Sequence, residues 1–331
     1  MNRFVFTCGD INGIGPEIVI KTLNKITSQN PTRKFYLSCP INIFEETISS
    51  LKPGFKYELI KDIKNETPDY LTVLDIGRAK QNVGKPTVSS GKASFRSLET
   101  SYNLLITGKA DAVITAPVSK TALNKAGIKF RGQTEIFADW TKTRNYVMTF
   151  LSQKMNAALL TTHYPLKKIP NLLKTKKLEA VIDVLIRTLK IDLGIYKPRI
   201  AVLGLNPHAG ENGIIGREEI EVITPVIRKY SKKIMINGPF SPDAFFANKL
   251  YKDFNLVLGM YHDQVLIPYK LLNFGVGVNY TAGLPIVRTS PDHGVAYDIA
   301  EKYIADENSM LQAFKYAERI VINRKKKIDE K

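Results

Sequence analysis

The sequence predicts an α/β fold with largely parallel sheets. Short runs rich in Val, Ile, Leu and Phe recur along the 331 residues, and stretches with helical periodicity separate them. This alternation is typical of α/β architecture, in which helices connect parallel strands. The expected strands are Phe4–Phe6, Phe35–Leu37, Leu71–Leu74, Ala112–Thr115, Val147–Phe150, Ala157–Leu160, Ile200–Leu203, Lys233–Ile236 and Leu256–Leu258.

Helices are expected between many of these strands. One begins at Pro16, because proline suits the first turn of a helix, where its missing N–H is not needed. Val19, Leu23 and Ile26 then follow at the i, i+4, i+7 spacing of a single helix face. The sequence contains no repeat and no low-complexity linker. The charged tail, Arg324 to Lys331, is the stretch that we expect to lack regular structure.

The composition predicts a soluble protein of a reducing compartment. Hydrophobic residues make up 44% of the chain and charged residues 24%, and no apolar run approaches the length of a membrane span. The opening MNRFVFTCGD has too short an apolar stretch for a signal peptide. Cys8 and Cys39 lie far apart and outside any CxxC pattern. We therefore expect no disulfide framework and a cytoplasmic location.

The formal net charge of +17 raises the question of nucleic-acid binding. The lysines are spread over many segments and form only short clusters, and no zinc-finger spacing, RNP signature or basic stripe interleaved with aromatics occurs. The pattern favours a lysine-rich solvated surface. An anionic substrate and cofactor fit the same charge bias.

Three of the four histidines directly follow apolar runs, at the expected ends of strands. His163 follows AALLTT, His208 follows IAVLGLNP and His262 follows LVLGMY. Ligands of open α/β sheets bind beyond the carboxyl ends of the strands, so three imidazoles there can meet around one divalent cation. The alternative is that each histidine only caps its own loop, and the spacing matches no short metal motif.

Two aspartates near these histidines are candidate acids or bases. Asp263 stands beside His262 in YHDQ, and Asp243 stands in GPFSPD after another apolar run. Each carboxylate can bind a metal, orient a ligand or accept a proton. The alternative for Asp243 is a role at the start of a helix, which aspartates often fill.

Two glycine-containing segments are candidate nucleotide loops. CGDINGIGPE opens a helix, but Gly13-x-Gly15 lacks the third glycine of the Rossmann fingerprint, so it indicates a tight turn rather than that motif. NYTAGLPIVRTSPDHGVAYDIA combines turn residues with Arg288 and His293, and we expect a helix after His293. This second segment can cradle an anion or an adenine, although an ordinary connecting loop has the same features.

Several longer blocks together resemble one enzyme family. They are TCGDINGIGPEI, TAPVSK, GQTEIFA, TTHYPLKKIP, GLNPHAGENGIIGREE, NGPFSPDAFF, MYHDQVLIPYK and VNYTAGLPIVRTSPDHGVAYDIA, and they run in family order from about residue 7 to residue 300. Blocks as long as GLNPHAGE are far more specific than an isolated glycine loop. The sequence resembles the 4-hydroxythreonine-4-phosphate dehydrogenases of pyridoxal phosphate biosynthesis.

The resemblance implies the fold of the isocitrate and isopropylmalate dehydrogenases, with two α/β/α domains and a cleft between them. We expect residues 1–130 with about 297–331 in the first domain. Residues 131–296 would form the second, which carries the metal ligands and the dimer interface. The resemblance also implies a homodimer whose active site lies at the interface, with His262 contributed in trans.

The resemblance assigns roles to named residues. His163, His208 and His262 match three ligands of one divalent ion (Zn, Mg or Co). The expected substrate contacts are Gln133, Thr134, Lys270, Asn279 and Arg288, and the expected contacts of NAD or NADP are Thr289, Asp292, His293, Gly294 and Asp298.

The implied reaction is NAD(P)-dependent oxidation of 4-phosphooxy-L-threonine to 2-amino-3-oxo-4-phosphooxybutanoate. That product decarboxylates to 3-amino-2-oxopropyl phosphate. The metal would activate the alcohol, with Asp263 or Asp243 as the base. The alternatives are a dehydrogenase of 4-phospho-threonate or 4-phospho-erythronate and, more remotely, a basic nucleic-acid-binding protein.

Three positions depart from the family pattern. Gln133 replaces a histidine, Ile11 stands where a proline is usual, and Val295 replaces the threonine of DHGTA. A glutamine can donate a hydrogen bond but cannot titrate near neutral pH. This departure therefore bears on the substrate, and the other two bear on loop stiffness and cofactor affinity.

Overall fold

The chain passes three times between two structural units. A computed structural model describes residues 1–27, 33–61, 71–130 and 132–329. Unit 1 comprises Met1–Lys142 and Leu284–Val321, and unit 2 comprises Thr143–Gly283 and Ile322–Lys331. The expected division makes only the first domain discontinuous, and its first break, at residue 131, lies outside the described residues. Segments 132–142 and 284–296 therefore belong to unit 1.

The strands of unit 1 run in the order β3-β4-β2-β1-β5-β12, and all neighbours are parallel. A parallel sheet is buried on both faces, which explains why β1, β2, β4 and β5 are mostly buried and largely apolar. The strands are β1 (Asn2–Thr7), β2 (Arg33–Cys39), β3 (Tyr57–Ile60), β4 (Leu71–Asp75), β5 (Ala112–Thr115) and β12 (Val287–Pro291).

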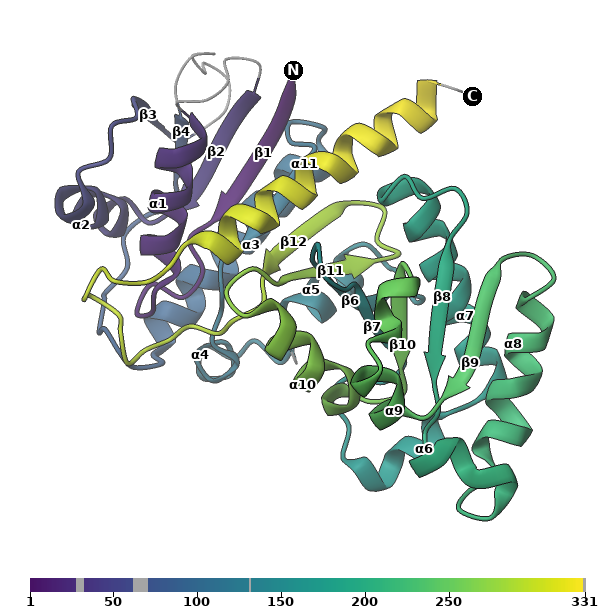
Figure 1. The fold of residues 1–331 in the computed structure, drawn as a ribbon. Helices are drawn as coiled ribbons and strands as arrows, with labels where there is room; N and C mark the ends of the chain where they lie inside the picture. The colour runs from purple at the N-terminus through teal and green to yellow at the C-terminus, as the bar shows by residue number, and fades with distance from the viewer. Residues whose placement is uncertain (28–32, 62–70, 131, 330–331) are drawn as a thin grey trace. The chain divides into compact units, whose positions relative to one another are not determined.

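Helices cover both faces of this sheet (Figure 1). α3 packs on β1, β2 and β5, while Phe314 of α11 packs on Phe4 and Phe35. α1 confirms the helix expected at Pro16, and its apolar stripe is buried. The helices are α1 (Gly15–Thr27), α2 (Ile41–Leu51), α3 (Val88–Ile106), α4 (Lys120–Lys125), α5 (Gln133–Trp140) and α11 (Asn308–Asp329), which continues into unit 2.

The strands of unit 2 run in the order β11-β6-β7-β10-β8-β9. β6 is antiparallel to both neighbours, whereas β7, β10, β8 and β9 are parallel. The expectation of largely parallel strands is thus confirmed, with β6 as the exception. The strands are β6 (Val147–Leu151), β7 (Ala157–Leu159), β8 (Arg199–Leu203), β9 (Met235–Phe240), β10 (Leu256–Gly259) and β11 (Val278–Ala282).

The core of unit 2 joins this sheet to α9 and α10. Phe245 of α9 and Tyr269 of α10 pack with Phe150 and Leu203 in one buried cluster. The helices are α6 (Ile169–Leu172), α7 (Thr175–Arg187), α8 (Thr224–Tyr230), α9 (Pro242–Ala247) and α10 (His262–Asn273), with shorter helical turns η1 (Leu166–Lys168), η2 (Thr188–Asp192), η3 (Pro207–Gly213), η4 (Glu219–Ile223) and η5 (Leu250–Asp253).

Two expectations about the C-terminal region are wrong. The helix expected directly after His293 is absent, and the next helix begins only at Asn308. Ala296, Glu301 and Tyr303 adopt left-handed backbone angles, which interrupt a right-handed helix. The tail expected to lack structure is helical to Asp329. Its Arg324 is fixed in unit 2 by the carboxylate of Asp192, with 2.7 Å between Nε and Oδ1.

None of the described helices is both long enough and apolar enough to cross a membrane.

Candidate active site

The three histidines lie at one edge of the unit 2 sheet. His163, His208 and His262 follow β7, β8 and β10, which are parallel neighbours in the order β7-β10-β8. The carboxyl ends of parallel neighbours meet at the same edge, so the expected position at strand ends is confirmed. We call these three residues the histidine edge.

Two of these imidazoles lie close together in the chain. The ring centroids of His163 and His262 are 5.8 Å apart. Metal–nitrogen bonds are about 2.1 Å long, so both rings can reach a single cation between them. The Nδ1 atom of His262 lies 2.7 Å from Oδ1 of Asp263, whose side chain is 72% exposed. If Nδ1 donates this hydrogen bond, Nε2 keeps its lone pair for a metal.

His208 does not complete this pair. Among the described residues, no three His, Cys, Asp or Glu side chains form a group that would hold a metal ion. His208 instead influences Asp243, a first-turn residue of α9. A hydrogen bond from Ser241 Oγ lowers the pKa of the Asp243 carboxyl, and His208 adds to this effect. The donor set fits a divalent cation in chemistry, but one chain gathers only two of the three imidazoles.

The loop that carries His208 has an unusual backbone. His208, Ala209, Glu211 and Asn212 all have φ between 43° and 52°. Each left-handed residue with a Cβ costs about 1–2 kcal/mol, so the surrounding contacts must hold this run.

Glu219 binds the start of this loop. Its buried carboxylate accepts hydrogen bonds from the backbone N–H groups of Leu205 and Asn206, at 2.7 and 2.8 Å, and from Asn206 Nδ2 at 2.9 Å. A Cβ on Gly210 would lie 2.6 Å from Glu219 Oε2, so a larger residue there would collide with the carboxylate. The sequence motif GLNPHAGENGIIGREE contained Glu219, but its role in holding the loop is visible only in the fold.

Two expected substrate contacts also lie in unit 2. Lys270 is exposed on α10, and Asn279 is half-buried on β11. The other three, Gln133, Thr134 and Arg288, lie in unit 1.

Arg288 is the centre of a buried polar cluster in unit 1. It lies on β12, is 2% exposed, and donates hydrogen bonds to Thr115 Oγ1 from Nε (3.1 Å) and Nη2 (2.9 Å). Nη2 also donates to Gln133 Oε1 at 3.1 Å, and Nη1 lies 3.4 Å from Thr134 Oγ1. Burial lowers the pKa of Arg288 to about 10, an effect that the Glu135 carboxylate opposes. We call Thr115, Gln133, Thr134 and Arg288 the arginine cluster.

The arginine cluster is suited to an anion. The guanidinium stays charged at neutral pH, and the nearby Glu135 carboxylate favours that charge. Gln133 and Thr134 begin α5, and the N-terminus of a helix favours negative charge. A phosphate or carboxylate therefore matches this cluster. Thr115, at the end of β5, was not among the expected site residues, although it begins the TAPVSK block.

Gln133 uses both ends of its amide within the protein. Oε1 accepts from Arg288, and Nε2 donates to the carbonyl of Ala116 at 2.9 Å. Both neighbours have fixed roles, because a guanidinium only donates and a carbonyl only accepts, so the orientation of the amide follows. The residue that replaces the family's histidine therefore holds Arg288 in place.

The expected cofactor residues begin on β12 and continue into the segment after it. The Thr289 hydroxyl donates to the carbonyl of Ala313 at 2.9 Å, which joins β12 to α11. The N–H of Asp292 donates to Ser309 Oγ at 3.2 Å, and His293 Nδ1 lies 3.0 Å from the carbonyl of Gly294. Asp298 is exposed. We call residues 289–298 the cofactor loop, after its expected role.

A family described as "Pyridoxal phosphate biosynthetic protein PdxA" matches residues 31–317 of the chain. The chain belongs to this PdxA family. The 4-hydroxythreonine-4-phosphate dehydrogenase of Aquifex aeolicus is 40% identical over 97% of this chain and 99% of its own length. The D-threonate 4-phosphate dehydrogenase of Salmonella typhimurium is 37% identical over 94% of this chain and 96% of its own.

Solved structures agree with this membership. The crystal structure of 4-hydroxythreonine-4-phosphate dehydrogenase from Klebsiella pneumoniae has a TM-score of 0.82 and 34% identity, and covers 97% of this chain and 100% of its own. Isocitrate dehydrogenase from Methylococcus capsulatus, at 13% identity, has a TM-score of 0.52 over 100% of this chain and 89% of its own. The expected fold class of this PdxA protein is thus confirmed.

Proposed function

We propose that this PdxA protein oxidises 4-phosphooxy-L-threonine with NAD or NADP. The secondary alcohol loses a proton to a base and a hydride to the nicotinamide, which gives 2-amino-3-oxo-4-phosphooxybutanoate. This 3-oxo acid then loses carbon dioxide and takes up a proton to give 3-amino-2-oxopropyl phosphate. The observation that carries the proposal is the buried, charged Arg288 on β12, whose guanidinium contacts Gln133 and Thr134 at the start of α5 and matches a phosphorylated or carboxylated substrate.

The residues of this chain then divide the work. Arg288 and Thr134 bind and orient an anionic group, with Lys270 and Asn279 as further substrate contacts. His163, His208 and His262 hold one divalent ion (Zn, Mg or Co), which when bound supplies a Lewis acid for the alcohol and for charge that develops on decarboxylation. The cofactor loop receives NAD or NADP. The base is Asp263 or Asp243, and a hydrogen bond from Ser241 lowers the pKa of the Asp243 carboxyl.

We also propose that the working unit is a homodimer whose active site needs both chains. α10 exposes Ile267 (59%), Leu271 (81%) and Phe274 just after its end (93%), a spacing that forms one apolar stripe. His262 begins the same helix, so a second copy packed on this stripe would also lie near the histidine edge. One chain gathers only His163 and His262 among its described residues, and a partner's imidazole would supply the third ligand.

Pairwise mixing of alanine variants tests which histidine crosses to the partner. The resemblance implies that His262 crosses, whereas the 5.8 Å approach of His163 and His262 in one chain favours His208. Under subunit exchange, only the pair His163→Ala with His262→Ala recovers activity if His262 crosses, and only the pair His163→Ala with His208→Ala recovers if His208 crosses. Recovery of both pairs would mean that His163 crosses. Random pairing makes about half of the dimers mixed, each with one intact site, so about a quarter of wild-type activity returns. If neither pair recovers despite proven exchange, the histidines of one site come from one chain.

The substrate assignment has a close alternative and a remote one. The relative named D-threonate 4-phosphate dehydrogenase supports 4-phospho-threonate, and with it 4-phospho-erythronate, as the alternative substrates. A panel of these acids and 4-phosphooxy-L-threonine, run with NAD and NADP after chelation and add-back of Zn, Mg or Co, decides between them. If the chain turns over none of the three, the proposed function is wrong. Filter binding at physiological salt tests the remote alternative, a nucleic-acid-binding protein.

We propose a cytoplasmic location. Both cysteines, Cys8 and Cys39, are free and buried, which suits a reducing compartment.

A further inference from the structure

The first sequence motif is in contact with the segment that follows β12, although the two are separated by almost the whole chain. The Tyr297 hydroxyl donates to Asp10 Oδ2 at 2.8 Å, and the N–H of Ile14 donates to the carbonyl of Val295 at 3.0 Å. A Cβ on Gly13 would lie 2.5 Å from that carbonyl, so the close approach requires glycine. The turn that contains Asp10 and Ile14 therefore contacts and supports part of the cofactor loop.

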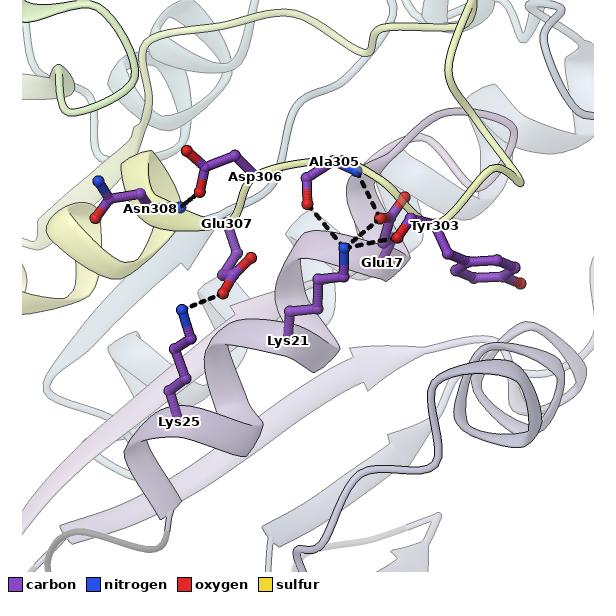
Figure 2. A network of polar contacts seen from close by, with 8 residues as sticks. All are labelled: Glu17, Lys21, Lys25, Tyr303, Ala305, Asp306, Glu307 and Asn308. Carbon is purple, nitrogen blue, oxygen red and sulfur yellow. Dashed lines mark hydrogen bonds and ion pairs between the residues drawn. The ribbon is translucent and has the colours of Figure 1, made fainter.

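α1 holds the continuation of this segment (Figure 2). Lys21 Nζ donates to the carbonyls of Tyr303 and Ala305, at 2.9 and 2.8 Å, and lies 2.7 Å from Glu17 Oε1. The same carboxylate oxygen accepts the N–H of Ala305 at 2.8 Å. Glu17 is 4% exposed, so these bonds lie in a low-dielectric environment that strengthens them. One turn further along α1, Lys25 pairs with Glu307 at a more exposed position.

The segment itself has no regular secondary structure. Residues 292–307 contain no helix and no strand. Ala296, Glu301 and Tyr303 adopt left-handed angles that cost energy for residues with a Cβ. Besides turns of its own and a bond to Ser309, the segment is held by bonds to Asp10, Ile14 and the Glu17–Lys21 pair.

We propose that Asp10, Glu17 and Lys21 are positioning residues that hold the cofactor loop in the shape that receives the nicotinamide cofactor. This proposal rests on the cofactor role of the loop in the proposed function. None of the three needs to contact the cofactor or the substrate. Their loss should weaken cofactor binding while substrate binding at the arginine cluster is retained.

Lys21→Met in the full-length protein tests the proposal, because it keeps the length of the side chain and removes its charge and donors. We expect the dissociation constant of NADH or NADPH, measured by fluorescence titration, and the KM of the oxidised cofactor to rise about tenfold. The KM of the phosphorylated substrate should stay within about twofold of wild type, because Arg288 is untouched. Lys21→Arg should restore most of the cofactor affinity, because it returns the charge and the donors.

Lys25→Met is the matched control, because it removes a pair from the same helix whose lysine side chain is 55% exposed. It should leave the cofactor affinity unchanged. Tyr297→Phe is a smaller variant that removes only the hydroxyl bonded to Asp10, and it keeps the test valid if Lys21→Met fails to fold. Folded Lys21→Met or Tyr297→Phe protein with wild-type cofactor affinity would overturn the proposal.

Hydrogen exchange separates this proposal from the proposed function. Lys21→Met should increase exchange of the backbone N–H groups in residues 292–307, whereas Lys25→Met should not. Unchanged exchange would mean that α1 does not position the segment. If the wild-type protein binds neither NADH nor NADPH, the proposed function fails, and the cofactor role of the loop fails with it.

Discussion

The arginine cluster of unit 1 and the histidine edge of unit 2 represent two ways of preparing a site. Arg288 is 2% exposed and is held by Thr115, Gln133 and Thr134 before any ligand binds. The His262 side chain is 41% exposed, and His208 lies on a strained loop apart from the pair of His163 and His262. The first site is prearranged by its own chain, whereas the described part of the chain brings only two of the three histidines of the second together. Substitutions should therefore act on binding at the first and on assembly at the second.

His208→Ala should have the largest effect, and it tests the role of the histidine edge. Substitution of groups that only support a metal ligand costs roughly 10–100-fold in affinity or activity, so loss of a ligand should cost more. We expect activity to be nearly abolished, with bound metal reduced and the circular dichroism spectrum unchanged. The measurements are turnover after chelation and add-back, and metal content. Near-normal turnover in chelated buffer would remove the histidine edge from the reaction.

Arg288→Lys tests whether the arginine cluster binds the substrate. A lysine keeps the charge but cannot bond two oxygens with a planar fork. A hydrogen bond to a charged group contributes roughly 1.5–3 kcal/mol, so the KM of the phosphorylated substrate should rise about tenfold or more. Steady-state kinetics provide the measurement.

Arg324→Lys is the control for this prediction. Arg324 is a partly buried arginine, with a side chain that is 22% exposed, and it bonds Asp192 and Tyr280 in unit 2. Its replacement should lower the free energy of unfolding and leave the KM unchanged. An equal rise of KM in both variants would indicate that Arg288 acts through stability rather than through the substrate.

The sequence predicted the apolar strands of both units, but it did not predict the strands that contain many polar residues. β11 and β12 were missed because Asn279, Thr281, Arg288 and Ser290 interrupt the apolar pattern, although pairing buries most of these residues. β3 was missed because it is an edge strand with alternating exposure. These segments form strands because they pair with strands that are distant in the sequence, and the local hydrophobic pattern does not indicate such pairing.

The candidate site divides in the same way. Strand-end positions of His163, His208 and His262 follow from apolar runs, so sequence could place them at one sheet edge. The partners of Arg288 could not be found by pattern, because Thr115 and Gln133 come from separate elements. The sequence places Asp10 only in a turn, because its bond to Tyr297 joins residues 287 positions apart.

Gln133→His sharpens the comparison by adding a titratable group to the prearranged cluster. A neutral imidazole can accept from Arg288 and donate to Ala116, as the amide does. A protonated imidazole cannot accept, and it repels the guanidinium. The KM of the variant relative to wild type should therefore rise about three- to tenfold as the pH falls through and below about 6.5. Burial and the nearby cation both disfavour protonation, so the inflection should lie on the acidic side of that value.

The ratio of the two KM values between pH 5.5 and 8 removes the titration of the substrate phosphate, which both proteins share. A ratio that does not change with pH, together with identical preferences across the acid panel, would make position 133 irrelevant to substrate handling.

The smallest expected effect comes from Glu301→Gly, which asks whether the bonded segment after β12 also stores strain as the His208 loop does. Glu301 is exposed and has a φ of 65°, a conformation that costs about 1–2 kcal/mol for a residue with a Cβ. Glycine avoids that cost but loses about 0.5–1 kcal/mol more conformational freedom on folding. The free energy of unfolding should therefore rise by about 0.5–1 kcal/mol, as measured by urea denaturation.

Lys302→Gly separates strain from the general cost of glycine in this segment. Lys302 is equally exposed and is absent from the left-handed residues of the described chain, and its N–H donates to the carbonyl of Ile299 at 3.2 Å. Because no strain is relieved there, this variant should lose about 0.5–1 kcal/mol. The two neighbouring substitutions should thus shift the urea midpoint in opposite directions. Equal losses in both variants would mean that Glu301 carries no strain, and that its left-handed angle is fully supported by the bonds from α1 to the residues that follow it.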